Sequence, residues 1–156
     1  MTPGHPPIDL KLILNARGRT NESRQYQLID CDPFPDKPGV YVIRYSSHSA
    51  ARMVGTSSIL KIGKADISIQ ERFANYNHMR HVTKETKNLI DLLDELPQPT
   101  NVRLMHFLSN EIHPSRIVVD CYFPGKGQSP RELEKQLLRE YFTTHRELPP
   151  LNFGFR

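Results

Sequence analysis

Two strand-forming apolar runs that lie close together in the sequence constrain this chain most. The first is Val40-Tyr-Val-Ile-Arg-Tyr45, and the second is Ile59-Leu-Lys-Ile62, which Gly63 is expected to end. Strands so near one another are most simply antiparallel, so residues 46–58 are expected to form a long hairpin loop. The prolines and aspartates of residues 32–39 predict a turn that leads into the first strand. A β-hairpin therefore stands at the centre of the predicted fold.

Further helix and strand signals surround this hairpin. Ser68 and Glu71 have the spacing of a capping box, and so do Ser129 and Glu132, with Pro130 at the first helical position. The further elements that we predict are a short strand or helix within 8–14, helices at about 68–81, at about 83–96 and from 129 to before 149, and strands at 102–108 and 116–123. Together they indicate an α/β fold of the α+β type, with a small, mainly antiparallel sheet flanked by helices.

The length of the chain fits one compact domain, with residues 1–34 as an N-terminal extension and residues 35–156 as the main body. The formal charge of +4 and the pI of about 9.2 favour a polyanionic partner such as nucleic acid, although many proteins carry a modest positive charge. Cys31 and Cys121 lack the paired spacing of a zinc site, and we expect reduced thiols in or near the core, as suits a cytoplasmic protein. No stretch reaches the length of a membrane helix and residues 1–7 lack the pattern of a signal peptide, so no membrane partner is expected.

One acid of the last predicted helix falls inside its apolar face. At about 100° per residue, the apolar arc is centred near Tyr141 with Phe142 at one border, and Glu134 falls in the middle of it. Glu140 falls at the edge of this arc, and Glu132 on the opposite side, where it can serve the cap. A carboxylate drawn toward the core needs a partner or a metal. Three interpretations account for this position: a metal site, a structural ion pair, or a helix end that is splayed from the core. The sequence alone does not choose among them.

The helix after Ser68 places an arginine on its apolar side. Arg72 projects between Met79 and Tyr76, one turn before Tyr76. An arginine with an aromatic neighbour is well suited to hold a phosphate, because its planar fork makes two hydrogen bonds. The alternative is an arginine that lays its stem on the core and extends its head to water. His78 falls on the polar face, where we expect it to be exposed or to touch the periphery of a ligand.

A lysine interrupts the second apolar strand. Lys61 lies between Leu60 and Ile62 and shares a face with Gly63, since side chains alternate along a strand. This position puts an amine on a sheet face near a glycine. Taken alone, however, Lys61 is explained more simply by a half-exposed strand.

These residues resemble the motifs of the GIY-YIG nucleases. Pro38-Gly39-Val40-Tyr41 and Lys61-Ile62-Gly63-Lys64 resemble the paired half-motifs of that family. Arg72 stands at a suitable distance for the family's arginine on the following helix. Glu134-Lys-Gln-Leu137-Leu138 matches the pattern around its catalytic glutamate, and Pro150-Leu151-Asn152 resembles a pattern near its end. The resemblance covers residues 35–153 and implies a GIY-YIG-like fold.

The chain departs from the common pattern in a way that resembles one branch of the family. Lys61 replaces the first tyrosine of the second half-motif. Certain restriction endonucleases of the family also carry lysine there, together with a tyrosine four residues after the arginine, where this chain has Tyr76. The loop of residues 46–58 is longer than in the minimal pattern, and its Arg52 is a candidate for contact with a DNA groove. Lys64 and His78 are further candidates for DNA contact.

The resemblance implies that the chain hydrolyses DNA phosphodiester bonds with one divalent cation, expected to be Mg²⁺. Glu134 would bind the metal, which neutralises charge on the scissile phosphate. Tyr41 would act as general base on the attacking water, with Lys61 as the cation that a tyrosine of reference pKa about 10 needs. Arg72 would hold the phosphate and stabilise the developing charge. Two more residues complete the implied site: Tyr76, which would orient the phosphate or the water, and Asn152, which would support the others.

Other functions stay open from the sequence. The same basic domain could hold nucleic acid without cutting it, which predicts salt-sensitive binding and no dependence on metal. It could act on RNA, or bind a protein partner after loss of activity. No helix-turn-helix or zinc module is visible, so sequence recognition would come from loops and from a second subunit. A homodimer would suit a palindromic site.

Overall fold

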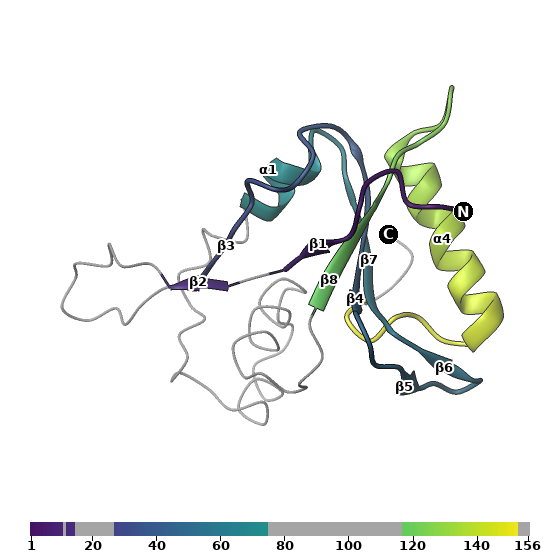
Figure 1. The fold of residues 1–156 in the computed structure, drawn as a ribbon. Helices are drawn as coiled ribbons and strands as arrows, with labels where there is room; N and C mark the ends of the chain where they lie inside the picture. Colours follow the sequence, from purple (N-terminus) through teal and green to yellow (C-terminus); the bar gives the residue numbers. More distant parts are fainter. Residues whose placement is uncertain (11, 15–26, 75–116, 153–156) are drawn as a thin grey trace, which may run out of the picture.

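The computed structural model describes residues 1–10, 12–14, 27–74 and 117–152. In these residues, a small antiparallel sheet lies between two helices (Figure 1), which confirms the mixed α and β class. Four predicted features lie outside the described residues: the helix at 83–96, the strand at 102–108, the part of the first helix beyond residue 74, and the candidate site residues Tyr76 and His78.

The central sheet has four strands in the spatial order β1-β8-β4-β7, all antiparallel to their neighbours. The bounds are Ile8–Asp9 for β1, Gly39–Tyr45 for β4, Ile59–Ala65 for β7 and Ile117–Tyr122 for β8. The predicted central hairpin is confirmed, because β4 and β7 pair with Tyr41 opposite Gly63 and Ile43 opposite Lys61. Residues 1–34 contribute β1, which pairs with β8.

The second strand of the hairpin runs past its predicted end. The expectation that Gly63 ends this strand is wrong, because Gly63 continues the pairing opposite Tyr41, and Ala65 pairs with Gly39. The missing side chain of Gly63 makes room for an aromatic ring. A Cβ at this position would lie 2.5 Å from Cζ of Tyr41. Glycine serves close approach here, a role that it often has inside a strand.

The segment between β4 and β7 contains a short ribbon of its own. β5 (Ala50–Ala51) pairs with β6 (Thr56–Ser57), so residues 46–58, which were predicted to form a long hairpin loop, join the two strands as expected but contain two further short strands. Gly55 at the turn has a φ of 71°, which glycine adopts without strain. Figure 1 shows this β5–β6 ribbon reaching away from the central sheet. β2 (Leu12–Leu14) and β3 (Gln27–Ile29) form a separate two-stranded ribbon.

Helices α1 (Ile69–Ala74) and α4 (Pro130–His145) lie on opposite sides of the sheet (Figure 1). The capping box predicted for α4 is confirmed. The Ser129 hydroxyl accepts from the backbone N–H of Glu132, whose carboxylate accepts from the backbone N–H of Ser129. α1 begins against the proline-rich turn, where the N–H groups of Ile69 and Gln70 donate to backbone carbonyls of Lys37 and Pro35. Among the described helices, none has the length and apolar character needed to cross a membrane.

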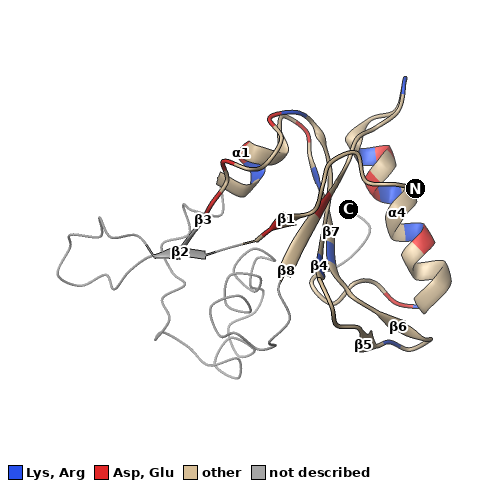
Figure 2. Ribbon diagram, viewed as in Figure 1, with Lys and Arg blue, Asp and Glu red and all other residues tan. Residues whose placement is uncertain are grey.

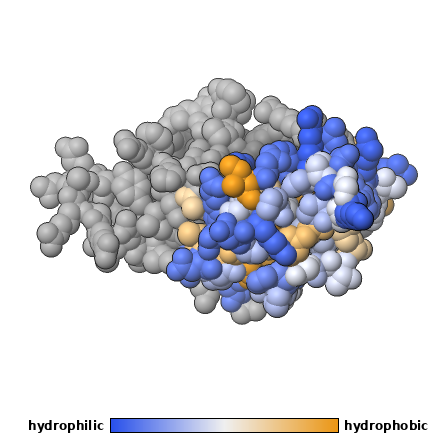
Figure 3. All heavy atoms as spheres, turned by 90° about the horizontal axis from the view of Figure 1, so that it is seen from above, coloured by the Kyte–Doolittle hydropathy of each residue, from blue (hydrophilic) through white to orange (hydrophobic). Residues whose placement is uncertain are grey.

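Alternating side chains of β4 build an apolar cluster on each face of the sheet. The cluster on the α1 side includes Phe34, Tyr41, Ile43, Ile69, Phe73 and Val119, and the cluster on the α4 side includes Val40, Val42, Ile62, Leu133, Leu138 and Tyr141. Phe142 was predicted to lie at the border of the apolar face of α4. It is 41% exposed, so the prediction that it belongs to the buried face is wrong. Both cysteines are free as predicted, with Cys121 buried and Cys31 packed at the border of the α1-side cluster. From above, the described surface is mostly hydrophilic, with small hydrophobic spots (Figure 3).

Candidate functional site

β4 and β7 bring a tyrosine and a lysine together on the α1 side of the sheet. Tyr41 is 1% exposed and Lys61 is 5% exposed. Their side chains share a hydrogen bond, and Nζ of Lys61 lies 5.9 Å from the centroid of the Tyr41 ring. The ring of Tyr41 lies over Gly63 and meets the edge of Phe73, with ring centroids 5.0 Å apart. Taken alone, Lys61 was best explained as a residue on the exposed face of a strand. This interpretation is wrong, because its amine is buried beside Tyr41.

The surroundings of Lys61 make its proton easier to lose. Burial lowers the pKa of this lysine, and the positive charge of Arg72 lowers it further, while Tyr41 and Glu134 act in the opposite direction. Arg72 comes from α1 and Glu134 from α4, so charges from both helices act on one buried amine. A lysine in such surroundings is suited to proton exchange, unlike a lysine on the surface.

Arg72 lies in the last turn of α1 and is exposed to solvent. The helix buries Ile69 and Phe73, and the prediction that Arg72 lies on its apolar side is wrong. The helix turns its apolar stripe onto Tyr41 and leaves the guanidinium at the surface, near Lys61. An exposed guanidinium next to a buried Tyr–Lys pair is suited to meet an anion that approaches the pair from solvent.

Glu134 lies half-buried on α4, whereas Glu132 and Glu140 are exposed. The helical projection predicted that Glu134 would be more buried than the other two acids of this helix, and this prediction is confirmed. Burial raises the pKa of Glu134, the negative charge of Asp66 raises it further, and Lys64 and Lys61 lower it. Its carboxylate accepts a hydrogen bond from the backbone N–H of Lys64. Glu134 thus meets the outer edge of β7 rather than the apolar core.

The outer edge of β7 is closed by the C-terminal segment together with Glu134. The backbone N–H of Leu151 donates to the carbonyl of Leu60 at 2.9 Å. The side chain of Asn152 pairs twice with Ile62, accepting from its N–H at 2.9 Å and donating to its carbonyl at 2.8 Å. The Asn152 side chain therefore makes the two hydrogen bonds that the backbone of a neighbouring strand would make. It holds Ile62, the residue between Lys61 and Gly63, in place.

Lys64 and Arg52, two of the predicted DNA contacts, carry acidic partners that sequence reasoning missed. The ammonium of Lys64 bonds the carboxylate of Asp66. Nε of Arg52 donates to Oε1 of Glu147 at 2.7 Å, which ties the β5–β6 ribbon to the end of α4. Asp66 follows Lys64 by two residues. Because the strand was predicted to end at Gly63, no sequence signal placed Asp66 next to Lys64. Nothing in the sequence pattern links Arg52 to Glu147.

Glu134 fits the demands of a magnesium ion better than those of a structural metal. Among the residues that the structure describes, no group of three or more His, Cys, Asp or Glu side chains could hold a metal. Mg²⁺, however, keeps several waters and is commonly bound through one or two carboxylates. Glu134, with Asp66 close enough to raise its pKa, offers such a ligand. A bound cation would favour the ionised carboxylate that burial disfavours.

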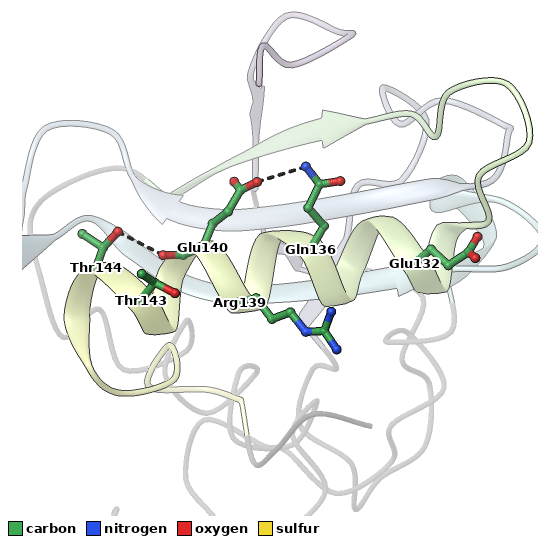
Figure 4. Close-up of a pocket in the computed structure, with 6 residues that line it drawn as sticks. All are labelled: Glu132, Gln136, Arg139, Glu140, Thr143 and Thr144. Carbon is green, nitrogen blue, oxygen red and sulfur yellow. Dashed lines mark hydrogen bonds between the residues drawn. The ribbon is translucent and has the colours of Figure 1, made fainter.

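The solvent side of α4 carries a shallow groove that is separate from this cluster. Its volume is about 450 Å³, and its lining residues are Glu132, Gln136, Arg139, Glu140, Thr143 and Thr144. Figure 4 shows these side chains along the helix, with Gln136 donating to Glu140. Because they project to the side of α4 opposite Glu134, the groove takes no part in the chemistry of the cluster.

Lysine or arginine residues occur on each of the four elements that carry the cluster, β4, β7, α1 and α4 (Figure 2). This distribution suits an anionic ligand, although acids are interspersed on α4 (Figure 2). No family model, no curated protein and no solved structure matches the chain. The function is therefore argued from the residues of the cluster that Tyr41, Lys61, Arg72 and Glu134 form around the β4–β7 hairpin.

Proposed function

We propose that this chain is a metal-dependent endonuclease of the GIY-YIG type that hydrolyses DNA phosphodiester bonds, with features of the restriction-endonuclease branch. The observation that carries the proposal is the convergence of three side chains, those of Tyr41, Arg72 and Glu134, on the buried Lys61. Tyr41 bonds Lys61, and the charges of Arg72 and Glu134 both act on the pKa of Lys61. These residues and Lys61 come from β4, α1, α4 and β7, and all four are among the six residues that the motif resemblance selects.

The Tyr41–Lys61 pair supplies the proton chemistry. Hydrolysis requires a base that removes a proton from water as the water oxygen attacks phosphorus. In the proposed step, Tyr41 acts as a phenolate that the hydrogen-bonded ammonium of Lys61 stabilises, and its oxygen takes the proton of the water. The water oxygen forms the new bond to phosphorus as the bond from phosphorus to the leaving oxygen breaks, and the leaving oxygen then takes a proton from solvent. Because both groups are buried, their interaction is stronger than it would be in water.

Arg72 and Asn152 have separate tasks in the proposed site. The exposed guanidinium of Arg72 binds the scissile phosphate as it approaches the buried pair and stabilises charge that develops on its oxygens. Asn152 is a positioning residue, because its two hydrogen bonds with Ile62 fix the strand that carries Lys61 and Gly63. We also propose that Tyr76, four residues after Arg72, orients the phosphate or the water.

Glu134 would hold the divalent cation, expected to be Mg²⁺. When bound, the cation supplies positive charge next to the scissile phosphate and the leaving oxygen. Glu134 is suited to this task because it is half-buried beside the strand that carries Lys61, and Lys64 and Lys61 both lower the pKa of its carboxyl group. We also propose that the chain acts as a homodimer, because a twofold dimer matches a palindromic DNA site. The proposed compartment is the cytoplasm.

The test is incubation of the purified chain with supercoiled plasmid, with and without Mg²⁺, followed by separation of products on a gel. Wild type should convert the plasmid to nicked, linear or laddered DNA only when Mg²⁺ is present. Glu134→Gln should abolish this conversion while the melting temperature stays near that of wild type. Glu140→Gln is the matched control, since Glu140 is an exposed acid of the same helix, and it should cleave like wild type.

The products also separate the proposed function from its alternatives. Full activity in Glu134→Gln would refute the role of this residue. Salt-sensitive DNA binding without cleavage in Mg²⁺ would indicate a binding module, and cleavage of RNA alone would indicate a ribonuclease. Discrete fragments would support the restriction-type activity, whereas a smear would indicate a nuclease without sequence preference.

A further inference from the structure

Lys64 and Asp66 form an ion pair at the end of β7, on the side of the sheet that α4 covers. The ammonium of Lys64 bonds the carboxylate of Asp66. Side chains two residues apart point to the same face of a strand, so Lys64 shares its face with Ile62. Ile62 belongs to the α4-side cluster together with Leu133. Lys64 therefore lies on the face that carries Glu134, the residue that follows Leu133.

Lys61, the other lysine of β7, lies on the opposite face of the same strand. It pairs with Ile43 of β4, and its amine is buried beside Tyr41. Lys64 pairs with Val40, three residues before Ile43, and its side chain is 28% exposed. The two lysines therefore have separate surroundings, and only Lys64 is bonded to an acid that solvent reaches.

The charges of Lys64 and Asp66 both act on Glu134. Burial has the largest effect on the pKa of Glu134 and raises it. Among the charges, that of Lys64 has the largest effect and lowers this pKa, while that of Asp66 raises it. Charges influence one another in this way only when they lie close together. The ammonium of Lys64 is thus a positive charge beside two carboxylates, as a bound divalent cation would be.

The ion pair between Lys64 and Asp66 is open to solvent. The side chain of Asp66 is 63% exposed. Exposed ion pairs contribute little to stability, because water screens them. The ammonium of Lys64 can therefore leave Asp66 at little cost, on a flexible four-carbon stem. Solvent access also suits Mg²⁺, which retains several waters and is commonly bound through one or two carboxylates.

We propose that Lys64 is a built-in competitor of the divalent cation: its ammonium neutralises the carboxylates of Asp66 and Glu134 until the cation binds to them and displaces it. This inference rests on the proposed function, which assigns the cation to Glu134. It adds Asp66 as a second carboxylate, and it makes Lys64 the residue that sets how much cation the site requires.

The test measures binding of Mn²⁺, which prefers the same oxygen ligands as Mg²⁺, to the full chain without DNA. The electron paramagnetic resonance signal of free Mn²⁺ reports the fraction bound. Lys64→Met should bind Mn²⁺ about tenfold more tightly than wild type, because it lacks the competing positive charge. Lys64→Arg keeps that charge and should bind Mn²⁺ like wild type. Lys126→Met removes an exposed lysine of the turn before α4, and it should also bind like wild type.

Asp66 separates displacement from a general effect of charge. Asp66→Asn should bind Mn²⁺ more weakly than wild type, and Lys64→Met should improve binding far less in a chain that also carries Asp66→Asn. All of these variants should melt near wild type, because the ion pair is exposed. An equal gain from Lys64→Met with and without Asp66 would overturn the inference. So would wild-type affinity in Lys64→Met, or no binding of Mn²⁺ by either chain.

The plasmid assay keeps this inference separate from the proposed function. In that assay, Lys64→Met should reach half of its own maximal rate at a lower Mg²⁺ concentration than wild type. If wild type cleaves plasmid but Lys64→Met binds Mn²⁺ no more tightly, the competition is refuted and the nuclease stands. If wild type leaves the plasmid intact but Lys64→Met binds Mn²⁺ more tightly, the competition stands and the nuclease is refuted.

Discussion

At the scale of single residues, Gly63 shows how an absent side chain shapes a site. The ring of Tyr41 occupies the space where a Cβ of Gly63 would be. Gly63→Ala should therefore displace Tyr41, destabilise the chain by about 1–3 kcal/mol and reduce plasmid cleavage. Thermal unfolding measures the first effect and the plasmid assay the second. Gly125→Ala is the control, because a Cβ there meets nothing within 4 Å. Equal melting of Gly63→Ala and wild type would contradict this packing.

Lys61 gives a prediction about pH. Because burial lowers its pKa in the folded chain, the unfolded chain binds more protons between that pKa and the unfolded value of about 10.4. Stability should therefore rise with pH across this window. Lys61→Met removes the titrating group, so its melting temperature should gain less than that of wild type between about pH 7 and pH 10. Lys126→Met, at an exposed position, should follow wild type. Parallel curves for Lys61→Met and wild type would show that Lys61 is not buried.

At the scale of elements, the N-terminus of α4 sets the position of Glu134. Ser129→Ala removes the hydroxyl that accepts from the N–H of Glu132, and it should destabilise the chain by about 1 kcal/mol. Because Glu134 lies near this end of the helix, fraying there should also slow Mg²⁺-dependent cleavage. Urea unfolding and the plasmid assay measure the two effects. Ser129→Asp keeps a cap and should stay close to wild type, and an equal loss in both variants would argue against the cap.

The elements with strong local signals were predictable from sequence. The apolar runs of β4 and β8, and the proline and capping box of α4, each lie within a few residues of the element that they specify. β1 and the β5–β6 ribbon have strands too short for a periodic pattern. β1 depends on pairing with β8, far along the chain. Such elements are set by tertiary contacts, which local propensity does not contain.

The candidate site likewise divides into residues that local sequence identifies and interactions that tertiary contacts create. Tyr41, Lys61, Arg72 and Glu134 could each be named from sequence, because motif spacing and helical projection single them out. Their interactions depend on the register of Tyr41 opposite Gly63 and on the edge of β7. The burial of Lys61 and the pairing of Arg52 with Glu147 arise from the packed structure alone.

At the scale of the whole molecule, Asn152 closes the outer edge of β7 at Ile62, next to the bond between Leu151 and Leu60. Asn152→Ala removes two hydrogen bonds to Ile62, so exchange of the Ile62 amide hydrogen should accelerate about tenfold or more. The exposed edge should also increase self-association at high concentration. Hydrogen exchange and light scattering measure these effects. Asn152→Asp keeps the acceptor for the Ile62 N–H and should fall between wild type and Asn152→Ala. Unchanged exchange in Asn152→Ala would contradict this closure.

The strand order of the sheet also governs when its parts can form during synthesis. β4 and β7 are near one another in the sequence, with only the β5–β6 ribbon between them, so they can pair soon after β7 has been made. β1 precedes them, yet its partner β8 begins only at Ile117. Among the strands of the central sheet, β1 is thus the one whose partner lies farthest away in the sequence. The pairing of Ile8 and Asp9 with β8 can therefore form only after β8 has emerged, late in the synthesis of the sheet.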